Sequence, residues 1–292
     1  MNFTQPITET ILNRFSCRTY LSAPIPGDIR QKLEEVTAGL QSGPFGTPLR
    51  YQVMAATDQE RKALRGLGTY GFIKNPSGFL VGALRPQAKD LEDFGYALEE
   101  LVLVATELGL GSCWLGGTFT RSGFADKIAV TREERMPAVV SLGLISDIEQ
   151  ARQAPMRRRI GSDSRLPWEG LFFEERFGDA LSHAAAGSYA QPLEMVRVAP
   201  SASNKQPWRI LHQGGAWHFY LHRITGYPGT LANTLMKIDD LPRVDMGIAM
   251  CHFALTAREL GLAGEWAVRE PALEKPDGQT EYTVSWIPAA RL

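Results

Sequence analysis

Residues 93–114, "DFGYALEELVLVATELGLGSCW", and residues 245–266, "DMGIAMCHFALTARELGLAGEW", are two versions of one segment. Aligned without a gap, they share Asp, Gly, Ala, Leu, Ala, Glu, Leu, Gly, Leu and Trp, which is 10 of 22 positions. Each version reads as a helix that an Asp caps, with apolar residues at helical spacing and a Gly-containing stop. Because each helix is apolar over more than half of its circumference, we predict that the pair is buried centrally and packs across a pseudo-twofold axis. The alternative is a chance likeness of two helices rich in Leu and Ala.

A second pair of stretches supports the duplication. Residues 40–51, "LQSGPFGTPLRY", align with residues 199–210, "APSASNKQPWRI", so that Ser42 matches Ser201, Pro48 matches Pro207 and Arg50 matches Arg209. The offset is 159 here and 152 for the helices, so the two matches run in the same order along the chain. The later stretch carries an Asn and a Gln that the earlier one lacks. We therefore predict that only the later stretch is a binding loop.

The remaining pattern predicts an α+β fold in which helices cover sheets. We expect a helix over residues 28–40 and a β-hairpin about Gly214 and Gly215. Further strands are expected at 50–56, 78–84, 137–145 and 281–288. We assign residues 1–150 to a first half, 151–178 to a basic linker that is aperiodic and rich in turn residues, and 179–292 to a shorter second half.

Composition excludes several classes of protein. The 292 residues are 44% apolar, and 31 basic against 32 acidic side chains give a formal net charge of −1. Such a balance predicts no general affinity for nucleic acid or for an anionic membrane. The three cysteines have no disulfide or zinc spacing, and no segment has the pattern of a signal peptide or a membrane span. We expect a soluble cytoplasmic protein without a metal.

Two basic stretches could bind an anion. In "RFSCRTY" the residues Arg14, Ser16 and Arg18 alternate beside the predicted end of the first helix, and two guanidiniums with one hydroxyl suit a phosphate. A solvated surface is the alternative for this triplet. In "MRRRIGSDSR" four arginines could meet an anion or merely solvate a linker: Arg157, Arg158, Arg159 and Arg165.

"GLGSCWLGG", residues 109–117, follows the first repeated helix. It cannot be a dinucleotide fingerprint, which follows a strand and opens a helix. We interpret it as a loop in which Gly116 and Gly117 let backbone N–H groups approach a flat ligand. The second copy lacks this glycine pair.

Three motifs together resemble those of the FMN-dependent nitroreductase family. They are Arg-x-Ser-x-Arg-x-Tyr at 14–20, Gly-Leu-Gly-Ser-x-Trp-x-Gly-Gly at 109–117 and Pro-Ser-x-x-Asn-x-Gln-Pro-Trp at 200–208. Their joint occurrence over most of the chain is far more specific than any one motif. The resemblance implies a three-layer fold, which in that family is an intertwined homodimer with FMN at the interface.

The resemblance also implies roles for individual residues. The FMN phosphate would be held by Arg14, Ser16 and Arg18, joined by the later basic residues Arg157 and Arg159. Backbone groups of Gly116 and Gly117 would lie at the flavin edge near N5. The ribityl chain or pyrimidine edge would meet Pro200, Ser201, Asn204 and Gln206. Cations that could stabilise the reduced ring are Lys74 and Lys205.

This chain divides the motifs between its halves, and so it resembles the fused branch of the family (the TM nitroreductase type), where one polypeptide makes both halves of the dimer. We expect a monomer with one FMN and a decayed second site. The implied reaction is ping-pong hydride transfer from NADH or NADPH through FMN to a small flat acceptor such as a nitroaromatic or a quinone, with no catalytic side chain, because the flavin carries the chemistry. The alternative is a non-catalytic flavin-binding protein that retains the scaffold.

Overall fold

The computed structural model describes residues 3–55, 64, 67–224 and 238–289. It contains two sheets, and the fold class is α+β, as predicted. The first sheet is antiparallel, in the order β1-β2-β4-β3. Its strands are β1 (Leu49–Ala55), β2 (Gly78–Leu84), β3 (Leu110–Leu115) and β4 (Val139–Leu144).

The second sheet has the order β5-β6-β7-β9-β8. Its strands are β5 (Phe172–Glu174), β6 (Trp208–Gln213), β7 (Ala216–His222), β8 (Gly264–Ala267) and β9 (Thr280–Pro288). All neighbouring strands are antiparallel except β5, which is parallel to β6.

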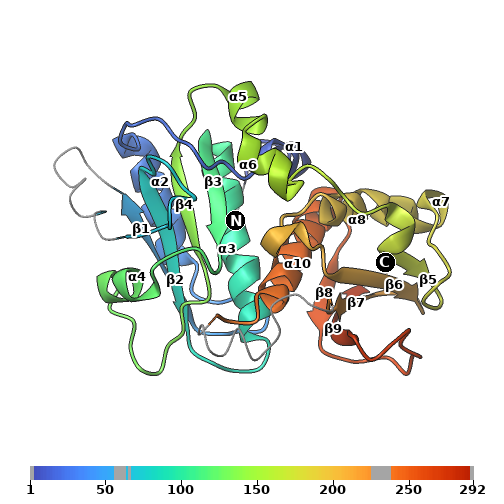
Figure 1. Ribbon diagram of the computed structural model, residues 1–292. Coiled ribbons are helices and arrows are strands. Elements are labelled where there is room, and N and C mark those ends of the chain that lie inside the picture. Colours follow the sequence, from blue (N-terminus) through green and yellow to red (C-terminus); the bar gives the residue numbers. More distant parts are fainter. Residues whose placement is uncertain (1–2, 56–63, 65–66, 225–237, 290–292) are drawn as a thin grey trace.

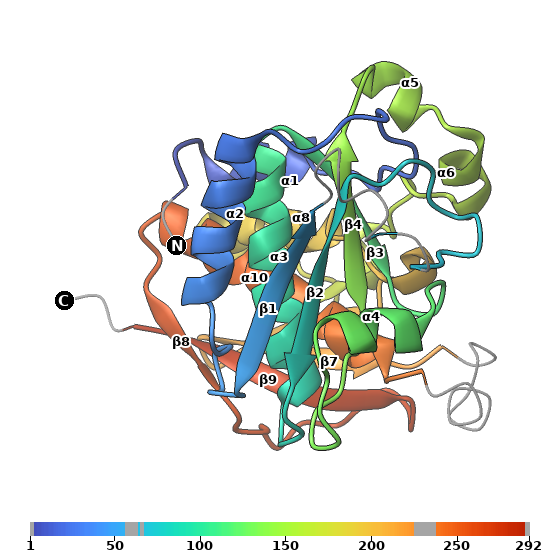
Figure 2. The ribbon, with the colours of Figure 1, turned by 90° about the vertical axis from the view of Figure 1, so that its left-hand side faces the viewer.

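Two long helices, α3 (Asp90–Glu107) and α10 (Leu241–Glu259), lie between the two sheets (Figures 1 and 2). They correspond to the repeated segments, and they pack against each other over much of their length. The inner faces of both sheets supply the core around them: Leu80, Leu84, Val140 and Leu142 beside α3, and Ile210, Trp217 and Phe219 beside α10. The molecule is therefore built in the order sheet, helix pair, sheet.

A glycine on each helix allows the helices to cross closely. A Cβ added to Gly95 would lie 2.1 Å from the backbone oxygen of Val244, and one added to Gly247 would lie 2.0 Å from the backbone oxygen of Glu92. Gly95 aligns with Gly247, and Glu92 aligns with Val244, at the same offset of 152. Each contact is thus the counterpart of the other, as in an isologous interface. This reciprocity is consistent with the predicted pseudo-dimer.

The predicted helix caps were wrong. α3 begins at Asp90 and α10 at Leu241, so that Asp93 and Asp245 lie inside their helices. Their carboxylates instead accept backbone N–H groups from the two matched stretches. Asp93 accepts from Phe45 and Thr47 at 2.9 Å each, and Asp245 accepts from Ala202 at 3.0 Å. Each half therefore fastens its own copy of the loop to its own central helix.

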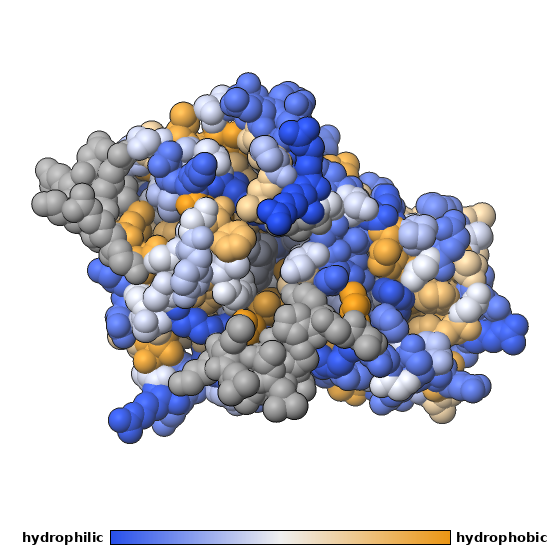
Figure 3. Space-filling view, viewed as in Figure 1, coloured by the Kyte–Doolittle hydropathy of each residue, from blue (hydrophilic) through white to orange (hydrophobic). Residues whose placement is uncertain are grey.

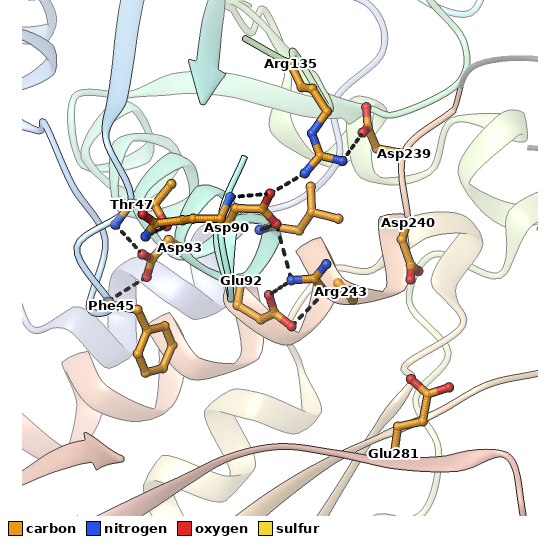
Figure 4. A network of polar contacts seen from close by, with 12 residues as sticks. Phe45, Thr47, Asp90, Glu92, Asp93, Arg135, Asp239, Asp240, Arg243 and Glu281 are labelled. Atoms are coloured by element: carbon orange, nitrogen blue, oxygen red, sulfur yellow. Dashed lines mark hydrogen bonds and ion pairs between the residues drawn. The ribbon is translucent and has the colours of Figure 1, made fainter. Parts of the chain in front are cut away.

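Charged side chains join α3 to the start of α10 (Figure 4). Arg243 donates to Glu92 at 2.6 Å and to Asp90 at 3.3 Å. Arg135 also donates to Asp90, and it donates to Asp239 at 3.3 Å. This network holds residues 239–243, at the start of α10, against α3.

Shorter helices cover the outside of this core. α2 (Gly27–Gly39) packs on β1, and α8 (Ala190–Arg197) packs on α10. The remaining helices are α1 (Ile7–Asn13), α4 (Arg121–Lys127), α5 (Ile148–Arg152), α6 (Pro155–Ile160) and α7 (His183–Ala186), with 3-10 turns at Trp168–Gly170, Gly187–Tyr189 and Ala202–Asn204. Among the described residues, no helix is long and apolar enough to cross a membrane.

Most predicted elements are present, with three differences. The expected strands correspond to β1, β2, β4 and β9, although Ala56 at the end of the first expected strand lies outside the described residues. The hairpin turns at Gly214 and Gly215, both at positive φ. Residues 110–115, predicted as part of a loop, form β3, which pairs with β4. Residues 264–267, where no strand was predicted, form β8, which pairs with β9. The range assigned to the linker contains α6 and also β5, which belongs to the second sheet.

Candidate functional site

A cavity of about 990 Å³ lies where the two halves meet. Figure 3 shows the surface hollowed there, beside hydrophilic residues. Its wall is formed by the chain after α1, the end of β3, the segment after α6, the loop at 200–205 and the first turns of α10. The predicted site residues that line it are Arg14, Ser16, Arg18, Gly116, Gly117, Arg157, Pro200, Ser201 and Asn204. A volume of this size suits a large organic ligand.

The segment after α1 is extended and lies along the edge of the first sheet. Ser16 forms a parallel bridge with Ser112, and the Cys17 N–H donates to the Ser112 oxygen at 2.8 Å. Side chains alternate along an extended chain, so Arg14, Ser16 and Arg18 face the cavity together, whereas Cys17 is buried in the core on the other side. The alternation expected from the sequence therefore brings these three residues to one wall.

Several arginine nitrogens in this wall are buried without a hydrogen-bond partner. They are Arg14 Nε, Arg18 Nη1 and Arg165 Nε. The Arg14 side chain is only 5% exposed, and its Nε lies 3.7 Å from a Glu99 oxygen. Burial lowers the pKa of Arg14 and brings the pKa of Arg165 down to about 10, where repulsion from Arg14 adds to the effect. Buried cationic donors without partners are costly, so this end of the cavity favours an anion.

The linker arginines divide into two groups. Arg157 is buried and lines the cavity, but its donors are engaged by Ser16 O at 3.1 Å, Arg152 O at 3.0 Å and the Asp163 carboxylate. Arg165 also lines the cavity. Arg158 and Arg159 are exposed and are not among the lining residues. Arg157 thus holds the backbone of the Arg14–Arg18 segment, and Arg165 occupies the wall position that was expected for Arg159.

The loop at 199–206 faces the cavity but turns its amide side chains toward the protein. Asn204 Nδ2 donates to Gly161 O at 2.7 Å and to Ser164 O at 2.9 Å. Gln206 is buried, does not line the cavity, and accepts the Leu166 N–H at 2.8 Å. Both residues have positive φ, a conformation that costs energy outside glycine. The amides therefore fasten the segment after α6 to the second half.

The glycine pair follows β3 and lies beside the start of α10. A Cβ at Gly116 would lie 2.4 Å from a Leu241 methyl, and one at Gly117 would lie 3.2 Å from Ile238. The Gly116 oxygen accepts from Arg121, which also pairs with Asp239 at 3.3 Å. In this structure, therefore, it is side chains of the second half, Leu241 and Ile238, that approach the two glycines closely. Of the two lysine candidates, Lys205 lines the cavity, and Lys74 does not.

Glu99 was missed by the sequence analysis. It is fully buried on α3 and accepts from Trp114 Nε1 at 2.7 Å, and it pairs with His252 Nε2 of α10 at 2.9 Å. With Arg14 nearby, it connects the Arg14–Arg18 segment, β3 and the second half. The signal was an acidic residue on the apolar face of the first repeated helix, at the position where the second copy has Cys251.

A family model described as "Putative TM nitroreductase" matches residues 6–257 of this sequence. The chain belongs to this nitroreductase family. The match covers nearly all of the first half and the second half as far as residue 257, and it includes every residue that we assigned to the site. The family resemblance inferred from the three motifs is therefore confirmed.

The fold is similar to that of a solved structure, and two further structures match part of the chain. A "putative nitroreductase" from Thermotoga maritima matches with a TM-score of 0.61 and 21% identity, over 98% of this chain and 95% of that chain. A nitroreductase with bound FMN from Bacteroides fragilis matches with a TM-score of 0.37 and 23% identity, over 49% and 90% of the two chains. A "putative nitroreductase" in complex with FMN from Desulfovibrio desulfuricans matches at 0.40 and 20%, over 53% and 95%. No curated protein matches the sequence.

Proposed function

We propose that the cavity between the halves binds FMN, with the phosphate at the arginine end. The observation that carries this proposal is the set of buried guanidinium nitrogens that have no hydrogen-bond partner, one each on Arg14, Arg18 and Arg165. Arginine is well suited to hold a phosphate because its planar fork donates two parallel hydrogen bonds. Membership of the nitroreductase family and the FMN named for two of the matched structures agree with the proposal.

The proposed roles follow from where the side chains lie. Arg14, Ser16 and Arg18 would donate to the phosphate. Arg165 of the linker would add its Nε, since its Nη atoms already donate to backbone oxygens of Ser162, Ser164 and Val198. The backbone of Gly116 and Gly117 would border the ring system. Pro200 and Ser201 would border it from the other half, while Asn204 and Gln206 would act by fixing the wall. Arg157 holds the backbone of the Arg14–Arg18 segment through Ser16 O and keeps one donor on Asp163. The hydrogen bonds give no support for a direct role of Arg159.

FMN, when bound, would carry electrons from NADH or NADPH to a small flat acceptor such as a nitroaromatic or a quinone. The chain would contribute binding and orientation. Apolar side chains suited to a flat ring line the same cavity, and two of them are partly open to solvent: Leu12 at 55% and Phe72 at 38% exposure. Ile238 and Leu241 complete an apolar wall. We also propose that the chain works as a monomer in the cytoplasm, with its duplicated halves replacing a partner subunit.

The test is the flavin spectrum of the purified protein and its response to reductants. We expect a yellow protein that bleaches when NADH or NADPH is added without oxygen. A colourless protein that takes up no FMN would refute the proposal.

A non-catalytic flavin-binding protein is the second candidate. It is favoured by the amides of Asn204 and Gln206, which bond to the protein and are not directed at a ligand. Bleaching by dithionite but by neither nicotinamide would support this candidate over the enzyme.

A further inference from the structure

The ion pair between Arg157 and Asp163 is unequal in its exposure. The Arg157 side chain is 3% exposed, whereas that of Asp163 is 67% exposed. Both residues line the cavity. The guanidinium is fixed by Ser16 O and Arg152 O, so only the carboxylate has space to leave the pair. Rotation of the Asp163 side chain into solvent would release an Arg157 donor at the arginine end.

Asp163 is also the main negative charge at this end of the cavity. Six arginines line the cavity: Arg14, Arg18, Arg152, Arg157, Arg165 and Arg197, the last of which pairs with Glu194. Among the described lining residues, carboxyl groups belong to Asp163 and Asp245 alone. Burial raises the pKa of Asp245 to about 8, which leaves it mostly uncharged at neutral pH, and Asp245 bonds to the Ala202 N–H. Glu99 lies behind Arg14 and already pairs with His252.

The backbone that carries Asp163 is held firmly. Gly161 has a positive φ of 65°, and the Ser164 N–H donates to the Gly161 oxygen at 2.9 Å, which closes a tight turn. Asn204 donates to the backbone oxygens at both ends of this turn. The second half therefore presents Asp163 at a fixed place beside Arg157, and the motion available to Asp163 is that of its side chain.

We propose that the Asp163 carboxylate is an internal counter-anion that occupies the position on Arg157 which the phosphate of a ligand would take. A ligand must displace Asp163 from Arg157, so the cavity favours ligands that carry more negative charge than Asp163 does. A ligand with one negative charge only replaces the charge of Asp163. A phosphate monoester dianion adds a second charge, and its oxygens can also accept from the nitrogens of Arg14, Arg18 and Arg165 that have no hydrogen-bond partner. Asp163 thereby makes the cavity selective for a dianionic phosphate monoester. The identification of FMN as that ligand rests on the function proposed above.

The test compares Asp163→Asn with wild type using three probes: FMN, riboflavin and inorganic phosphate. Removing one negative charge a few ångströms from the phosphate should tighten FMN and inorganic phosphate by about tenfold. Riboflavin has no phosphate, so its affinity should not change. The matched control is Asp179→Asn, which breaks an exposed pair with Arg176 that is not part of the cavity wall and should change none of the three affinities.

The outcomes separate this inference from the proposed function. Wild-type protein that binds neither FMN nor riboflavin would refute the proposed function, and the phosphate measurement would still decide the role of Asp163. The inference is wrong if Asp163→Asn binds inorganic phosphate no better than wild type, or if riboflavin gains as much as FMN. Asp163→Ala, which removes the polar group entirely, should give the same phosphate-specific gain.

Discussion

The reciprocal glycine contact between α3 and α10 leads to a strong prediction for Gly247→Ala. The new Cβ would lie 2.0 Å from Glu92 O and 2.7 Å from Tyr96 N, and both of these atoms belong to the backbone of α3. Contacts below 3.0 Å are essentially never seen for a Cβ, so the helices must separate by at least the difference of 1.0 Å. A gap of this size between the helices removes roughly a quarter to a half of the dispersion energy of the contacts that it separates.

We expect Gly247→Ala to lower the free energy of unfolding by about 2 kcal/mol, since an overpacking cost of about 3 kcal/mol outweighs the gain of about 1 kcal/mol from the better helix propensity of Ala. For a chain of this size the melting temperature should fall by about 4–8 °C. Thermal unfolding followed by circular dichroism, without added flavin, measures this change.

The control is Gly39→Ala at the last residue of α2, where no atom lies within 4 Å of the new Cβ. Its melting temperature should be unchanged or slightly higher. Gly95→Ala should resemble Gly247→Ala, and the double variant should lose less than the sum, because one separation of the helices relieves both clashes. A Gly247→Ala protein as stable as Gly39→Ala would refute the close crossing.

Two further variants test the loop of the second half. Asn204→Ala removes the hydrogen bonds to Gly161 O and Ser164 O, so the affinity for FMN should fall about tenfold while the protein stays folded. Flavin titration measures the affinity and circular dichroism checks the fold. An unfolded variant would contradict this prediction. Burial raises the pKa of Asp245 to about 8 in the folded protein, whereas the same carboxyl in the unfolded chain loses its proton near pH 4. The folded state therefore loses stability relative to the unfolded state as the pH rises from about 4 to about 8. Between pH 5 and 8 the free energy of unfolding of the wild type should fall by up to about 4 kcal/mol relative to that of Asp245→Asn. If the melting temperatures of the two proteins change equally with pH over this range, the carboxyl is not buried as described.

The sequence predicted the parts of this fold that depend on local pattern. Helices and strands repeat over short intervals, so their faces can be predicted from nearby residues. This applies to the apolar faces of α3 and α10 and to the alternation that places Arg14, Ser16 and Arg18 on one side. The segment of β3 was interpreted as a loop, and no strand was predicted at β8, because both segments follow a helix directly and contain glycine. Their strand conformation comes from pairing with β4 and β9, whose residues are distant in the sequence.

The partners of buried polar groups could not be predicted in the same way. Asp93 and Asp245 look like helix caps locally, but the helices begin earlier, and loops from elsewhere in each half reach their carboxylates. Asn204 looks like a ligand-binding amide, yet the oxygens that it meets belong to a turn 40 residues earlier. Which of the arginines near 157–165 faces the cavity depends on that turn, and so Arg165 could not be separated from Arg159 by composition.

The asymmetry between the halves predicts one FMN per chain. A smaller cavity of about 610 Å³ lies at the related place in the second copy, beside Ser42–Pro44 and Gly264–Trp266. Trp266 corresponds to Trp114, but its Nε1 is buried without a hydrogen-bond partner among the described residues, because Cys251 stands where Glu99 would accept that bond.

The described wall of this second cavity has one arginine, Arg258, against two acids, Glu100 and Glu265, so it lacks the positive charge that a phosphate requires. Titration of the protein with FMN, followed by flavin absorbance against protein concentration, should therefore saturate at one flavin per chain. Glu99→Gln should weaken this single site without creating a second. Saturation at two would mean that the related cavity still binds flavin without an arginine cluster, and the assignment of the phosphate to Arg14, Arg18 and Arg165 would lose its basis.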